Sequence, residues 1–272
     1  AIKNLPKDIN YSLYDNNNDG LIDNVHIIFA GYGEEAGASS YAIWSHEYPY
    51  RINLNNEIGY SLASYSCTPE LRGNNGAKIS NIGVICHELG HALGAMDYYD
   101  TNYETGGRYI GTGQWDIMAD GSWNNDGKTP PNFNPYIRSI VFGWNEQITL
   151  ESEEDIIMPT TDLNNINKSI IYRINTENDK DYFLLENRQK IYFDSALPGE
   201  GLIIYHIHPE IDRYTATNTI NSTQPQCFYP VCASDSDPST KNYGNNNSSS
   251  CPFTSSKNKE TFSPLSTPTM IA

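Results

Sequence analysis

Residues 80–100 read SNIGVICHELGHALGAMDYYD, and this stretch predicts a helix from Ser80 to Gly94. Ser80 is placed to cap the start of the helix, and Gly94 is placed to end it. Five apolar side chains recur at helical spacing and form one stripe that we expect to pack on the core: Ile82, Ile85, Cys86, Leu89 and Leu93.

Residues 87–91 of this helix form an HExxH motif. His87 and His91 are four residues apart, so both imidazoles lie on one face and can reach a single ion. At about 100° per residue, that face lies opposite the apolar stripe. Glu88 points away from the ligand direction, which suits a general base beside the ion. The alternative interpretation is a helix with incidental surface histidines.

The motif continues through Gly94 to Asp97, which gives the longer pattern HExxHxxGxxD. Glycine adopts positive φ easily and lets the chain leave the helix sharply, so we predict Asp97 as a third zinc ligand. Two neutral imidazoles and one carboxylate leave Zn²⁺ at net +1, the balance of known His2Glu zinc hydrolases. Asp100 competes with Asp97 for this role, and Glu104 is a candidate if the site is of the gluzincin type.

A second short stretch, residues 115–121, reads WDIMADG. A tight turn carrying Met118 would place an apolar floor beneath the imidazoles and shape the surroundings of the ion. Alone, a buried methionine indicates only core packing. A further donor to a tetrahedral oxyanion is expected in such a site, and the candidates are Tyr98, Tyr99 and His46.

HExxHxxGxxD followed by a methionine turn resembles the metzincin style of zinc peptidase, and the finer pattern resembles the M6 family, the immune inhibitor A type of bacterial secreted metallopeptidase. One departure is Tyr98, where that family often has an acidic residue. The matching segments are residues 15–23 (DNNNDGLID), 29–34 (FAGYGE), 43–46 (IWSH), the motif helix through Thr101, 116–123 (DIMADGSW), 184–189 (LLENRQ) and 197–206 (LPGEGLIIYH).

The resemblance implies an α+β fold: a zincin or metzincin-like catalytic domain, with a mixed sheet and an active-site helix, followed by a β-rich C-terminal region. We expect the catalytic core in residues 1–150, and a β-rich extension with a loop-rich tail in residues 151–272. The implied protein is a bacterial zinc endopeptidase, secreted or at the cell surface, that cuts proteins or peptides with Glu88 as general base. The alternative is an extracellular binding or adhesion module with structural zinc, although such zinc has no use for Glu88.

Period-two apolar patterns predict the strands of this fold. We expect a further helix at Tyr136–Phe142, and Ile58–Ser66 as the sheet edge that receives an extended substrate. The predicted strands are Val25–Ala30, Tyr41–Ser45, Ile58–Ser66, Ser169–Ile174, Tyr182–Glu186 and Gly201–His208. His206 and His208 share one face of the last strand, which indicates a strand face rather than a second metal site.

Residues 15–23 follow the beginning of an EF-hand loop, in which Gly20 permits the sharp turn. The twelfth position is His26 instead of glutamate, so we predict an EF-like structural Ca²⁺ loop rather than a sensor. An Asx-rich turn before a strand is the alternative. The predicted oxygen ligands come from Asp15, Asn17, Asp19, the carbonyl of Leu21, and Asp23.

The composition restricts the partners. The chain of 272 residues has 33 Asp and Glu against 17 Lys and Arg, a formal charge of -16. This charge repels phosphate backbones, so no nucleic-acid partner is expected. No apolar run approaches the roughly 18 residues of a membrane span. The chain opens without methionine or an apolar leader, so we expect a removed signal or pro-segment. Among the five cysteines, one disulfide is possible within the set Cys227, Cys232 and Cys251.

Overall fold

The computed structural model describes residues 4–54, 59–103, 109–152, 155–161, 170–222, 225–234, 245–254 and 261–262. The chain divides into two compact units, Ala1–Gly94 and Ala95–Ala272. Within the described residues, no helix has both the length and the apolar character needed to cross a membrane. The division expected near residue 150, with a catalytic core before it and a β-rich extension after it, stays a prediction because a compact unit by itself has no assigned role.

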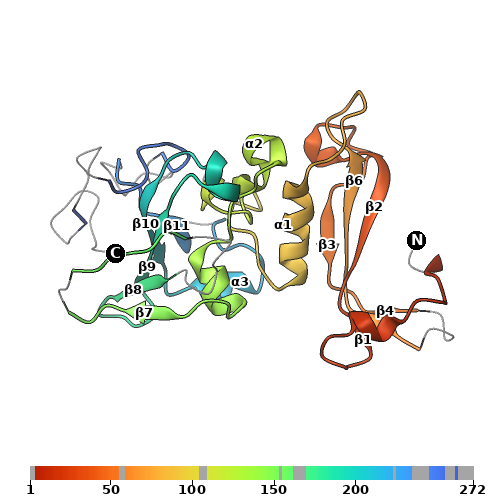
Figure 1. Cartoon of the computed structure of the whole chain (residues 1–272), viewed down its shortest axis with the longest axis horizontal. Helices are drawn as coiled ribbons and strands as arrows, with labels where there is room; N and C mark the ends of the chain where they lie inside the picture. The colour runs from red at the N-terminus through yellow and green to blue at the C-terminus, as the bar shows by residue number, and fades with distance from the viewer. Residues whose placement is uncertain are drawn as a thin grey trace. The chain divides into compact units, whose positions relative to one another are not determined.

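The first unit carries two small sheets and the motif helix (Figure 1). β6 has β2 as a parallel neighbour and β3 as an antiparallel one, so this sheet is mixed, as predicted. In the other sheet β5 lies between β1 and β4. The elements are β1 (Leu21–Ile22), β2 (Val25–Tyr32), β3 (His46–Tyr48), β4 (Ile52–Asn53), β5 (Ser61–Leu62), β6 (Tyr65–Leu71) and α1 (Ile82–Ala92), with 3-10 helices at Tyr11–Tyr14 and Glu34–Ala36.

Two strand predictions in this unit are wrong. Segment 41–45 is irregular, because Glu35 accepts hydrogen bonds from the backbone N–H and the hydroxyl of Ser45 at 3.1 and 2.7 Å, and β3 begins only at His46. Segment 58–66 does not supply a sheet edge, since it contributes β5 and the start of β6, which are both central strands. Its first residue, Ile58, lies outside the described residues. The strand predicted at Val25–Ala30 is confirmed as β2.

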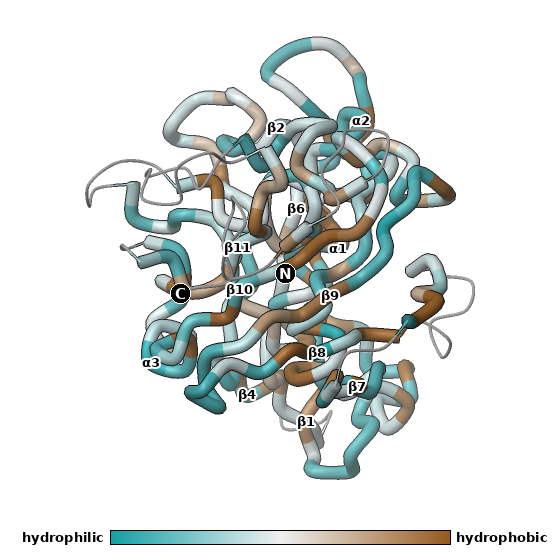
Figure 2. The backbone as a smooth tube through the Cα atoms, turned by 90° about the vertical axis from the view of Figure 1, so that its left-hand side faces the viewer, coloured by the Kyte–Doolittle hydropathy of each residue, from teal (hydrophilic) through white to brown (hydrophobic). Residues whose placement is uncertain are grey.

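Helix α1 contacts β6 and β3, and its first half is apolar in Figure 2. It begins at Ile82 after Asn81, so the cap predicted at Ser80 is wrong; the Ser80 N–H instead donates to Glu70 O at 2.9 Å. The predicted apolar stripe does not pack on the core, because Ile82, Leu89 and Leu93 are exposed. The buried residues of α1 are Gly83, Glu88 and Gly90.

The second unit is built on one sheet with the strand order β11-β10-β9-β8-β7, antiparallel except for the parallel pair β7 and β8. The three strands predicted here are confirmed as β8, β9 and β10, with Ser169 outside the described residues. The elements are α2 (Asn124–Gly127), α3 (Ile211–Thr215), β7 (Gln147–Thr149), β8 (Ile171–Asn175), β9 (Tyr182–Arg188), β10 (Gly201–Ile207), β11 (Phe228–Pro230), 3-10 helices at Gly113–Trp115, Asp120–Trp123 and Tyr192–Ala196, and a π-helix at Ile137–Val141.

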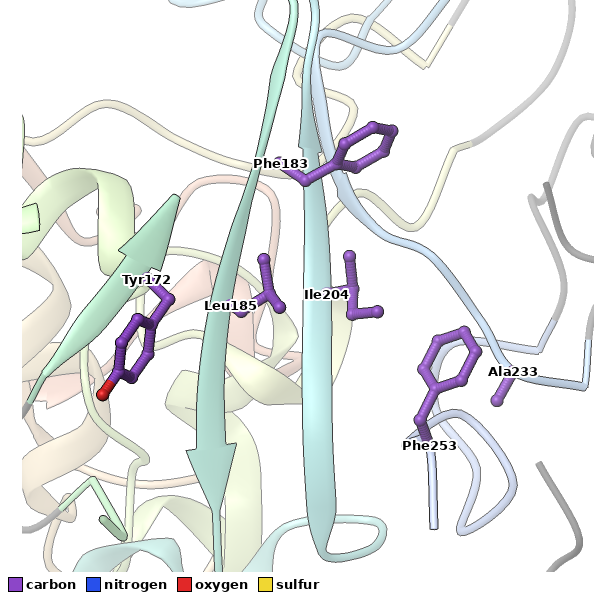
Figure 3. Packing of buried hydrophobic residues seen from close by; sticks show 6 residues of the cluster. All are labelled: Tyr172, Phe183, Leu185, Ile204, Ala233 and Phe253. Atoms are coloured by element: carbon purple, nitrogen blue, oxygen red, sulfur yellow. The ribbon is translucent and has the colours of Figure 1, made fainter. Parts of the chain in front are cut away.

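One face of this sheet carries an apolar core. Leu185 of β9 pairs with Ile204 of β10 and with Tyr172 of β8, so the three side chains share a face. Phe183 of β9, together with Ala233 and Phe253 from the following segments, completes the cluster (Figure 3). Nearby, the Ala233 N–H donates to Cys251 O at 2.8 Å.

All five cysteines are free thiols, so the disulfide considered within the set Cys227, Cys232 and Cys251 is not formed in this structure.

The other face of the sheet buries charge. Glu186 and Arg188 of β9 are fully buried, and Arg188 bonds Glu186 at 3.0 Å and Asp194 at 2.7 Å. Arg138 bonds the second oxygen of Glu186. Arg138 comes from the helix predicted at Tyr136–Phe142, which the structure forms as a π-helix with Phe142 N–H donating to Ile137 O at 2.9 Å.

Replacing Arg188 by Leu is expected to lower the free energy of unfolding by about 3–5 kcal/mol, because it leaves the buried carboxylate of Asp194 without its cation and leaves Glu186 with Arg138 alone. Arg213→Leu is the matched control, since Arg213 is 71% exposed and pairs with Glu210 at 3.4 Å. That control should cost less than about 1 kcal/mol. Guanidinium-induced unfolding of both variants measures the difference, and equal costs would contradict a stabilising role for the buried network.

Candidate metal centre

His87 and His91 lie one turn apart on α1. Their ring centroids are 4.8 Å apart and their planes are nearly perpendicular, at 88°. Both residues are half-buried, and the intervening Glu88 is buried. The helix itself therefore fixes the separation of the two imidazoles.

The backbone turns sharply after the helix. Gly94 has a φ of +100°, in the left-handed region that favours glycine, and its N–H donates to His91 O at 2.8 Å. Gly94 therefore ends α1 in the way the sequence predicts. Asp97 follows three residues later and is buried.

His87, His91 and Asp97 each offer a ligand atom, and these atoms lie within 4.8 Å of one another. In the described part of the chain, no other group of three or more His, Cys, Asp or Glu side chains is placed in this way. Two imidazoles and one carboxylate fit Zn²⁺, whose tetrahedral site needs donor atoms roughly 3.4 Å apart and keeps one position open in catalytic sites.

The two candidate aspartates have different surroundings. Asp97 Oδ2 accepts a hydrogen bond from Asn218 Nδ2 at 2.7 Å. Asp100 instead accepts three backbone N–H groups with its carboxylate, from Asn102 at 3.2 Å, Tyr103 at 3.1 Å and Tyr109 at 3.4 Å. Asp100 thus holds the backbone at residues 102, 103 and 109. Glu104, the third alternative, lies outside the described residues.

Met118 is fully buried in a tight turn of the second unit. Asp116 shapes this turn, because its Oδ1 accepts the Met118 N–H at 3.1 Å. Burial raises the pKa of the Asp116 carboxyl, and hydrogen bonds from Asn134, Met118 and Thr112 oppose that shift. The Met118 carbonyl accepts the Tyr98 N–H at 2.8 Å, one residue beyond Asp97. A floor of Met118 beneath the imidazoles stays a prediction.

The three predicted oxyanion donors differ in availability. Tyr98 is fully buried, packs edge-to-face on Phe228, and has its pKa raised well above the usual value by burial. His46 is held in the first unit by Trp44 O at 2.8 Å and by the Tyr65 hydroxyl at 3.0 Å. Tyr99 is half-buried and stays a prediction.

Two residues near the ligands were not found from the sequence. Burial raises the pKa of Glu47 on β3, and the nearby imidazoles of His91 and His46 oppose this shift. Asn218 bonds Asp97 across 121 positions of the chain. No local pattern could have predicted that contact, since it depends on the course of the whole second unit.

The predicted calcium loop is tightly turned, with Asn18 and Gly20 at φ of +60° and +82°. Asp15 accepts the N–H groups of Asp19 and Gly20 at 3.0 and 2.9 Å, and Asp19 accepts the Leu21 N–H at 2.8 Å. Asn17 Oδ1 also accepts the Asp19 N–H, at 3.1 Å, and Asp23 accepts the Asn16 amide. These contacts are those of an Asx-rich turn.

His206 forms no metal group with His208 in the described residues. Its Nε2 lies 2.6 Å from Asp181 Oδ1, and its Nδ1 lies 2.9 Å from the Tyr229 hydroxyl. The ring also stacks on Phe183 with centroids 5.0 Å apart. His206 is therefore part of the sheet packing.

Comparisons with known proteins agree with the motif. The sequence profile "Immune inhibitor A peptidase M6, catalytic domain" matches residues 6–141, half of the chain. Immune inhibitor A of Bacillus thuringiensis subsp. alesti is 37% identical over 166 residues, covering 54% of this chain and 23% of that protein. Pre-pro-metalloprotease PrtV of Vibrio cholerae serotype O1 is 34% identical over 139 residues, covering 45% of this chain and 14% of that protein.

The matched part thus spans less than a quarter of either relative. The profile covers the whole segment that carries His87, His91 and Asp97. Because the family profile matches half of the chain and two relatives agree with it, the chain belongs to the immune inhibitor A peptidase M6 family.

Proposed function

We propose that this chain is a secreted, zinc-dependent endopeptidase that hydrolyses peptide bonds in proteins. The observation that carries the proposal is the group of three side chains, His87, His91 and Asp97, with ligand atoms within 4.8 Å of one another. Three protein ligands are typical of catalytic zinc, whereas structural zinc has four. The family assignment supports the same reaction class.

Glu88 is the general base of this proposal. A bound zinc ion lowers the pKa of water and polarises the substrate carbonyl. Glu88 accepts the proton of the attacking water and returns it to the leaving amine nitrogen. Two observations support this role: Glu88 lies between the two histidines in the sequence of α1, and it is buried away from bulk water.

The substrate is proposed to bind in extended form along β3. In the described residues, β3 pairs with β6 on one side only, so its other edge offers backbone groups to an added strand. β3 also contacts α1. Tyr48 and the nearby Tyr50 are exposed and stack with centroids 5.9 Å apart, which provides apolar surface for substrate side chains.

The alternative is an extracellular binding or adhesion module in which zinc is structural. A purely structural site gives no role to an acidic residue between the two histidines, so Glu88 discriminates between the two functions. The Vibrio relative is named a pre-pro-metalloprotease. By analogy, we propose that this protein is secreted and that a pro-segment is removed from it. Calcium at residues 15–23 is proposed as a structural ion.

Replacing Glu88 by Gln is expected to leave zinc bound and to lower kcat for casein cleavage by about 10²–10⁴-fold, because the general base is lost. Glu70→Gln, on an exposed position of β6, is the control and should keep full activity. Zinc content and kcat are measured on both variants. A fully active Glu88→Gln variant would refute the assignment of the base.

Asp97→Ala and Asp100→Asn separate the two candidate ligands. Asp97→Ala is expected to weaken zinc binding by more than the roughly 10–100-fold that follows loss of an outer partner. Asp100→Asn keeps a carbonyl acceptor for its loop and should bind zinc as the wild type does. Competition with a chromophoric chelator measures both affinities, and the reverse order would make Asp100 the ligand.

Calcium is expected to raise the melting temperature of the wild-type chain, by the equivalent of about 2.7 kcal/mol at a hundred times Kd. Asp19→Ala should abolish this increase, and Asp8→Ala, at an exposed position outside the loop, should retain it. Melting curves with and without Ca²⁺ supply the readout. A wild type that does not respond to Ca²⁺ leaves the loop as an Asx-rich turn.

A further inference from the structure

We propose that Asn218 is a positioning residue that holds the carboxylate of Asp97 in the orientation in which it binds zinc. This inference rests on the zinc site proposed above. Asn218 lies beyond residues 6–141, which the family profile matches, and it follows α3 in the β-rich part of the chain.

A single amide side chain holds Asp97 at two points. The Asp97 N–H donates to Asn218 Oδ1 at 2.7 Å, and Asn218 Nδ2 donates to Asp97 Oδ2 at 2.7 Å. The backbone and the carboxylate are therefore fixed together. A carboxylate that accepts an outer hydrogen bond on one oxygen can bind an ion with the other, and such outer bonds orient metal ligands.

The backbone of Asn218 is shaped to present this amide. Its φ is +53°, in the left-handed region that asparagine tolerates better than most residues. The turn after α3 creates this conformation, because the Asn218 N–H donates to Thr215 O at 3.1 Å and the Thr219 N–H donates to Tyr214 O at 3.0 Å. The hydrogen bonds of this turn therefore fix the direction in which the Asn218 side chain leaves the backbone.

The same turn also binds the far end of the ligand segment. The Thr101 hydroxyl donates to Asn218 O at 2.7 Å, and the Thr101 N–H donates to Ser222 Oγ at 3.0 Å. These two bonds hold the loop without involving the carboxylate of Asp97. The contacts of Thr101 therefore offer a structural comparison for the contacts of Asn218.

The alternative is that Asn218 only stabilises the fold. A purely structural clamp needs just the backbone contacts, whereas Nδ2 of Asn218 is bonded to the carboxylate oxygen of a predicted ligand. Hydrogen bonds to a charged group are also stronger than neutral ones. If Asn218 positions the ligand, loss of its amide lowers zinc affinity by more than the change in stability explains. If Asn218 is purely structural, zinc affinity changes only as far as stability does.

Asn218→Gly tests the proposal, because glycine keeps the left-handed backbone and removes only the amide. Asn125→Gly is the matched control, since Asn125 is also left-handed, with φ of +48°, and is exposed. Thr101→Val is the structural control. Zinc affinity is measured by chelator competition, Co²⁺ absorption reports the ligand geometry, and thermal unfolding of the zinc-free chains reports stability.

The expected result is a roughly 10–100-fold loss of zinc affinity and an altered Co²⁺ spectrum in Asn218→Gly, with apoprotein stability no lower than that of Thr101→Val. Both controls should bind zinc as the wild type does. Unchanged affinity in Asn218→Gly, or a zinc-free variant less stable than Thr101→Val, would overturn the positioning role. A wild type that binds no zinc would instead refute the proposed function itself.

Discussion

The buried carboxylate of Glu186 sets the architecture of the second unit. It lies between Arg138 and Arg188, and all three side chains are removed from solvent. Each buried ion costs several kcal/mol unless it is paired and hydrogen-bonded. The Tyr205 hydroxyl, 3.0 Å away, and Asp194 complete the pairing. The segments that carry these groups must therefore meet, because any of them left alone would bury an uncompensated charge.

This network extends to the segment that carries Asp97, the predicted third ligand. Arg188 Nη1 donates to Trp115 O at 3.1 Å, next to the turn formed by Asp116 and Met118. The Met118 carbonyl in turn accepts the Tyr98 N–H at 2.8 Å. Hydrogen bonds and the intervening backbone of residues 115–118 thus link β9 to Tyr98, the neighbour of Asp97. The strands of the second unit and the segment that carries Asp97 therefore belong to one compact unit.

The sequence was sufficient where the physical signal is local. Helical spacing predicts α1 and the shared face of its two histidines, and Gly94 ends the helix as expected. Prediction from the sequence failed where the structure depends on packing partners that are distant in the sequence. The exposed Leu89 and Leu93 show that an apolar stripe does not reveal which face packs, and sheet order put segment 58–66 in central strands.

The choice between the two aspartates shows the same limit. The spacing HExxHxxGxxD favours Asp97, and Asp100, three residues further on, is the competing carboxylate. The structure separates them because three backbone N–H groups surround Asp100, whereas a side-chain amide holds Asp97. Such contacts depend on how distant loops return. Periodicity and spacing carry no information about them.

Two kinds of constraint therefore act on the three predicted ligands. His87 and His91 are set by the helix alone, so their separation exists wherever α1 forms. Asp97 is held by Asn218, which lies 121 positions further along the sequence. The affinity of the proposed site for zinc should therefore depend on the folding of the second unit, because Asp97 is the one predicted ligand that is held by a contact from that unit. If zinc binds as proposed, this dependence couples the strands of the second unit to a motif that they do not contain.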